Sequence, residues 1–142
     1  MTLIEADGLT RLLADFESTE LPWERWRDHA THLQVACAHL LRYPPDEATD
    51  RMSAGIKRIN AAHGVEMTPT SGYHETMTRC WMKLVEHRLA QNAEKPVPER
   101  VQHVVTGLAD KKVLHEHYSR DRLMSWEARI GWLEPDLKPL PG

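Results

Sequence analysis

The sequence predicts an all-α fold: an up-down helical bundle of about four principal helices, with short extra helices and an extended C-terminal tail. Apolar residues recur every three or four positions over most of the chain, which is the spacing of one helix face. Nowhere do four or more β-branched or aromatic residues alternate with polar ones, so strand signals are almost absent. Prolines and glycines fall between the periodic segments, where helices begin and end.

Three helices are predicted in the first half of the chain. A short helix covers about 9–17, and a long one covers 22–42, with a proline in its first turn. Pro44 and Pro45 end this long helix, because a helix interior does not tolerate proline. The third helix, 46–64, begins with an aspartate suited to the N-cap and ends at a glycine suited to the C′ position.

The second half contains one long helix, 72–92, capped by Thr70 or Ser71. Shorter helices are expected after a proline-rich break, over 99–108, over 111–118 and for a turn or two beyond Ser125. Three prolines make the tail over 134–141 extended.

Length and composition indicate one globular domain, 1–142, made of an N-terminal segment (1–21), the motif-bearing helices (22–92) and a C-terminal segment (93–142). Apolar residues are 41% and charged residues 27% of the chain, as is typical of globular proteins. The net charge of −3 gives no electrostatic reason to expect nucleic acid as a partner. No apolar run approaches the ~20 residues needed to cross a bilayer, so no membrane partner is expected.

We expect a cytoplasmic location. The first residues lack the basic segment and apolar stretch of a secretory signal. Cys37 and Cys80 both fall inside apolar helical patterns, which favours reduced core thiols over a disulfide.

Nine histidines are the main unusual feature, and two of them lie on the core side of helix 22–42. At 100° per residue, His29 lies inside the apolar stripe and His32 lies at its edge. Residues three apart are neighbours on a helix surface, so the two rings can converge on one point. The stripe itself consists of Trp26, Leu33, Cys37 and Leu40.

A third histidine, His74, lies near the middle of the apolar arc predicted for helix 72–92. A buried imidazole needs partners, because an unpaired buried polar group costs roughly 1–3 kcal/mol. His29, His32 and His74 could satisfy this need by holding one divalent transition metal, Zn, Fe, Ni or Cu, between the two helices. Three protein ligands leave an open position, as in catalytic metal sites.

Other polar residues near these histidines complete the predicted site. Glu75 is the candidate catalytic acid or base, or a carboxylate that orients a ligand histidine. It could equally be a first-turn glutamate favoured by the helix dipole. Tyr73 and Asn60 are candidate substrate contacts, and Arg120 could clamp an anionic group. Ordinary packing explains Tyr73 and Asn60 as well, and an ion pair with the acidic tail explains Arg120.

The combined motifs resemble a family of small, largely uncharacterised bacterial helical proteins. The matching segments are His29-Ala30-Thr31-His32-Leu33 with Ala36 and Leu40, Asn60 and Gly64, Gly72-Tyr73-His74-Glu75-Thr76-Met77-Thr78, Tyr118 to Ser125, and Glu134 to Leu137. This resemblance implies a helical domain that pairs a His-x-x-His motif with a Tyr-His-Glu-Thr motif, and it brings no known activity. The chain is more loosely similar to DinB-like bundles, in which a histidine triad holds a metal between helices.

The sequence thus suggests a metal-dependent enzyme that acts on a small-molecule substrate. Water bound to such a metal reaches a pKa near 7, which suits hydrolysis or elimination, whereas a redox metal would suit oxygen chemistry. The alternative is a non-catalytic binding or structural bundle. Its histidines would hydrogen-bond internally, and its tail would mediate contacts in a homodimer.

Overall fold

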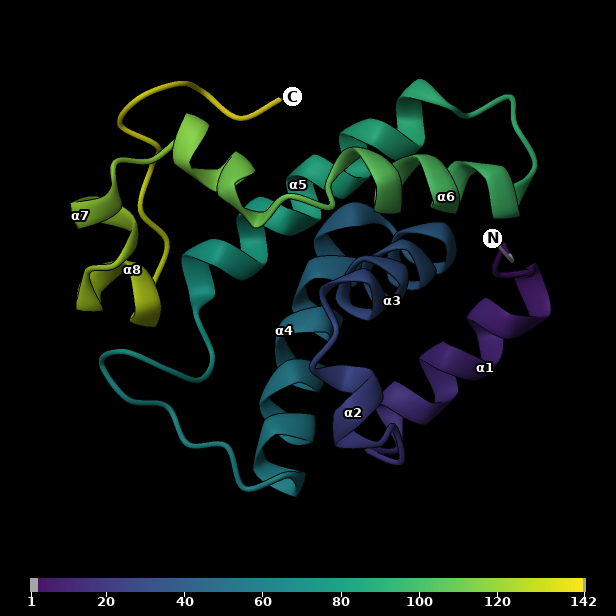
Figure 1. The fold of residues 1–142 in the computed structure, drawn as a ribbon, viewed down its shortest axis with the longest axis horizontal. Coiled ribbons are helices and arrows are strands. Elements are labelled where there is room, and N and C mark those ends of the chain that lie inside the picture. Colours follow the sequence, from purple (N-terminus) through teal and green to yellow (C-terminus); the bar gives the residue numbers. More distant parts are fainter. Residues whose placement is uncertain (1–2, 142) are drawn as a thin grey trace.

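Helices make up the regular structure of the chain, whose computed structural model describes residues 3–141 (Figure 1). Over these residues the chain forms no strand, only an isolated bridge between Thr68 and Ser71. The predicted all-α class is therefore confirmed. The elements in chain order are α1 (Ala6–Glu17), α2 (Trp23–Trp26), α3 (His29–Arg42), α4 (Pro45–Ala62), α5 (Glu75–Gln91), α6 (Val97–Gly107), the 3₁₀ helix η1 (Lys111–Glu116), α7 (Arg120–Leu123) and α8 (Trp126–Ile130).

The predicted long helix 22–42 is wrong as a single element, because it divides into α2 and α3. Asp28 has extended backbone dihedrals and acts as the N-cap of α3, its carboxylate accepting a hydrogen bond from the Ala30 amide at 3.3 Å. Apolar periodicity continues across this break, so the sequence pattern did not reveal it. His29 consequently occupies the first turn of α3 rather than the middle of a long helix.

The other predicted helices match the structure more closely. α4 agrees with the prediction to within a few residues, and Gly64 follows it with a φ of +74°, a value that favours glycine. The predicted helix 111–118 is a 3₁₀ helix, and the predicted helix 72–92 begins three residues late, at Glu75.

α3 occupies the centre of the molecule and packs against α1, α4, α5 and α6 (Figure 1). Most of its surface is therefore buried, including Val35 and Cys37, which have no solvent exposure. Cys80 on α5 is equally buried, and both cysteines are free thiols, as predicted.

The chain that follows α8 passes over the first turn of α5, where hydrogen bonds hold it. The Thr76 hydroxyl, on the first turn of α5, donates to the Gly131 carbonyl at 2.7 Å and accepts from the Leu133 amide at 3.1 Å. The Tyr118 hydroxyl donates to the Leu133 carbonyl at 2.6 Å. Within residues 3–141 no helix has the length and apolarity needed to cross a membrane.

The contact between α1 and α4 depends on a glycine. The ring of Phe16, which is fully buried, lies directly over Gly55 of α4. A Cβ atom at this position would overlap with the aromatic ring, which cannot move within a packed core.

We therefore expect Gly55→Ala to lower the free energy of unfolding by about 1–3 kcal/mol, as overpacked core positions do. Urea denaturation would measure the change. Gly131→Ala is the matched control, because the nearest atom to its added Cβ would lie 3.8 Å away. Equal stabilities for the two variants would contradict this packing.

Candidate functional site

A cavity of about 420 Å³ lies among α2, α3, α4, α5 and the loop that precedes α5. We call it the histidine pocket. Its walls are mainly apolar and aromatic. It contains five of the seven predicted site residues, namely His29, His32, Asn60, Tyr73 and His74. Glu75 and Arg120 are not among the residues that line it.

His29 lines the pocket from the first turn of α3. Its Nε2 lies 2.9 Å from the Leu108 carbonyl, so this nitrogen carries the proton and donates it. The ring packs against Trp81 with 4.8 Å between the centroids. Because a neutral imidazole has one N–H, Nδ1 presents a lone pair to its surroundings.

His32 lies one turn further along α3, with its ring over Trp26 at a centroid distance of 4.1 Å. Burial lowers its pKa to about 4, and a hydrogen bond with the Trp26 backbone offsets this only in part. The ring is therefore neutral at pH 7. Its Nε2 is screened from solvent and has no hydrogen-bond partner among the described residues.

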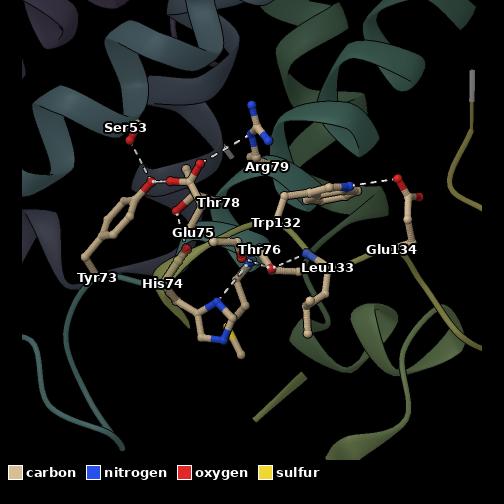
Figure 2. A network of polar contacts seen from close by, with 12 residues as sticks. Ser53, Tyr73, His74, Glu75, Thr76, Thr78, Arg79, Trp132, Leu133 and Glu134 are labelled. Atoms are coloured by element: carbon tan, nitrogen blue, oxygen red, sulfur yellow. Dashed lines mark hydrogen bonds and ion pairs between the residues drawn. The ribbon is translucent and has the colours of Figure 1, made fainter. Parts of the chain in front are cut away.

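His74 plays a different part, as the N-cap of α5 (Figure 2). Its Nδ1 accepts from the Met77 amide at 3.1 Å, and its Nε2 donates to the Leu123 carbonyl at 2.8 Å. The predicted position in the middle of a helical arc is therefore wrong. Burial is the main cause that lowers the pKa of His74, and the nearby Arg129 contributes.

The three histidines line one cavity, but their present geometry does not fit a shared metal site. Both nitrogens of His74 are already hydrogen-bonded, so it has no free lone pair. Among residues 3–141, no group of three or more histidine, cysteine, aspartate or glutamate side chains is arranged to hold a metal ion. A metal ligand role for His74 would require it to release the Met77 amide.

Glu75 belongs to a polar network beside the pocket (Figure 2). Its carboxylate accepts a hydrogen bond from the Tyr73 hydroxyl and lies 3.4 Å from the Arg79 guanidinium. The Tyr73 hydroxyl also contacts the Ser53 hydroxyl of α4 at 2.7 Å. Burial, together with the hydrogen bond to Glu75, raises the pKa of Tyr73 to about 12, so the phenol stays protonated. These hydrogen bonds connect the loop before α5 to α4.

The two remaining predicted residues lie in different places. Asn60 lines the pocket, and its Oδ1 accepts from the Trp26 indole N–H at 3.3 Å. Arg120 is exposed on the short helix α7. The prediction that it lies with the other site residues is therefore wrong, because no pocket wall comes from α7.

Sequence reasoning missed Arg129, which supports the pocket from outside. Its side chain is only 6% exposed, and its guanidinium donates to the carbonyls of Gly72 and Tyr73 at 2.9 and 3.1 Å. It thereby fixes the backbone just before His74. A single arginine in a short helix carries no sequence signal for this role.

Comparison of the chain with protein-family models, with curated proteins and with solved structures gives no match. The resemblance to a bacterial helical family therefore stays a prediction, and the function is inferred from the geometry of the site.

The low pKa of His32 predicts how stability depends on pH. Between pH 6.5 and 4 the unfolded chain binds a proton at His32 that the native protein does not bind, so the free energy of unfolding falls as pH falls. We expect His32→Asn to reduce this fall by up to about 3 kcal/mol, at ~1.4 kcal/mol for each pH unit. Urea denaturation between pH 4.5 and 7.5 would measure it.

His87→Asn is the matched control for this prediction, because His87 is an exposed histidine on α5. It should keep the pH dependence of the unmodified protein. An identical dependence in His32→Asn would show that His32 titrates normally.

Proposed function

We propose that this protein binds a small, largely apolar molecule in the histidine pocket. The observation that supports the proposal is the pocket's composition: aromatic and aliphatic walls with a few polar groups. Small-molecule sites typically have this character and volumes of about 300–1,000 Å³. The apolar walls include Trp26 and Trp81, with Met52 and Ile56 of α4 and Met77 of α5.

The supporting structure around the pocket also favours binding. The His74 cap, the Arg129 contacts to the Gly72 and Tyr73 carbonyls and the Tyr73–Glu75 network hold one wall in place. A preorganised site binds more tightly, because less conformational freedom is lost when the ligand arrives.

Blocking the pocket tests this proposal. Met77 is half-buried and lines the cavity, so Met77→Trp should fill it with a larger side chain. We expect neutral aromatic fragments to give saturation-transfer NMR signals with the unmodified protein and none with this variant. Met124→Trp is the matched control, because Met124 is 44% exposed and lies outside the pocket. Fragment signals that persist in Met77→Trp would contradict the proposal.

A metal-dependent enzyme that acts on a small molecule is the second candidate for the same pocket. Metal-binding histidines usually donate their other N–H to a carbonyl or a carboxylate, as His29 does to Leu108. The ligands of the metal would be Nδ1 of His29 and Nε2 of His32. His74 would join them only after it releases the Met77 amide. Glu75, which binds Tyr73 and Arg79, would act from beside the pocket.

Metal analysis separates the two candidates. If the protein is a metal-dependent enzyme, protein purified without a His-tag should carry a stoichiometric transition metal. His32→Ala should then abolish metal binding. Chelation should then lower the melting temperature, because a ligand at a hundredfold excess over Kd stabilises the native state by ~2.7 kcal/mol. If the protein only binds a small molecule, we expect no more than traces of metal and no effect of the chelator on the melting temperature.

A further inference from the structure

We propose that the ligand of the histidine pocket is a neutral aromatic molecule that donates an N–H or O–H hydrogen bond to the His29–His32 pair. This inference rests on the proposed small-molecule binding and specifies the ligand's chemistry. It depends on the protonation of the two imidazoles, on the charges around the cavity and on the shape of the walls.

Both imidazoles offer only acceptors for a ligand. The proton of His29 is held at Nε2 by the Leu108 carbonyl, which leaves the Nδ1 lone pair. We assign the proton of His32 to Nδ1, because the Trp26 backbone raises the pKa of this ring, as a nearby acceptor does, while Nε2 has no partner among the described residues. An acceptor is satisfied by a donor, so the ligand must bring the N–H or O–H group.

The unpaired Nε2 of His32 strengthens this argument. Its accessible area is below 1 Å², so neither water nor a ligand reaches it unless a neighbouring side chain of the pocket wall moves aside. A buried acceptor without a donor destabilises the protein, and a ligand donor that reaches it would remove this cost. His39 has a similarly unpaired Nε2, but its ring does not line the histidine pocket.

The charges around the cavity favour a neutral ligand. Among the described residues, no carboxylate lines the pocket, so a cationic ligand would find no counter-charge. Within residues 3–141, the only formally charged side chain that lines it belongs to Arg27, which is exposed at the end of α2. Because the N–H of His29 is already donated to the Leu108 carbonyl and the ring of His32 is uncharged at pH 7, an anion would find no cationic imidazole in the pocket.

The walls favour an aromatic body. The indole rings of Trp26 and Trp81 each pack against one of the two histidines, at 4.1 and 4.8 Å between centroids. Planar rings contact such walls with a large area and gain from offset or edge-to-face packing. A planar molecule with a donor on its edge therefore matches both the walls and the acceptors.

Indole and 1-methylindole test this inference, because they share one ring system and only indole carries an N–H donor. We expect the unmodified protein to bind indole about tenfold more tightly than 1-methylindole in calorimetric titrations. His32→Phe keeps an aromatic ring over Trp26 but removes the acceptor, and it should reduce the preference to about threefold or less, leaving only the contribution of His29. His87→Phe, a change at an exposed histidine outside the pocket, should keep the tenfold preference.

The outcomes separate this inference from the proposed function. Equal binding of the two probes to the unmodified protein would overturn the donor requirement and leave small-molecule binding intact. A tenfold preference that persists in His32→Phe would also overturn the assignment to His32. If neither probe binds, both the inference and the proposed function fail. The probe comparison on the unmodified protein needs no variant to fold.

Discussion

The imidazole of His74 joins two parts of the molecule through its two nitrogens. Nδ1 caps α5 at the Met77 amide, and Nε2 binds the Leu123 carbonyl of the C-terminal segment. His74 also lines the histidine pocket. An N-cap contributes about 0.5–2 kcal/mol, and here its loss would also leave the buried carbonyl of Leu123 unpaired. The start of α5, the position of α7 and the shape of the pocket all depend on this residue.

The same pattern, an imidazole N–H donated to a distant backbone carbonyl, occurs at His29 and again at His63. His29 binds Leu108 at the end of α6, and His63 binds Leu21 before α2 at 2.9 Å. Histidine suits this task because its planar ring satisfies a carbonyl that no helix or strand pairs. The abundance of histidine therefore has a structural explanation at several positions. His32, with an unpaired nitrogen in the pocket wall, is the one of the three predicted ligands that this explanation leaves out.

Much of the candidate site could be predicted because helical periodicity identifies which residues face the core. The spacing of His29 and His32 placed both rings on the inner side of α3, and five of the seven predicted residues line one cavity. Periodicity does not indicate where a helix begins, and two predicted helix starts at the site were wrong. Asp28 starts α3 at His29, and His74 precedes α5 instead of lying within it. In both cases a single side-chain hydrogen bond to the backbone set the boundary.

The sequence by itself determined the all-α class, the burial of Cys37 and Cys80, and the inward direction of the histidines, because these follow from the local spacing of apolar residues. Tertiary structure alone decided which nitrogens of the three histidines are hydrogen-bonded and which stay free. The Leu108 and Leu123 carbonyls that fix two of the rings lie 79 and 49 residues away from them in the chain. Likewise, the Glu75 carboxylate contacts Tyr73 and Arg79 beside the pocket. Arg120 lies on α7, which does not line the pocket. A hydrogen bond between distant residues depends on the packing of whole helices, and local sequence spacing does not encode it.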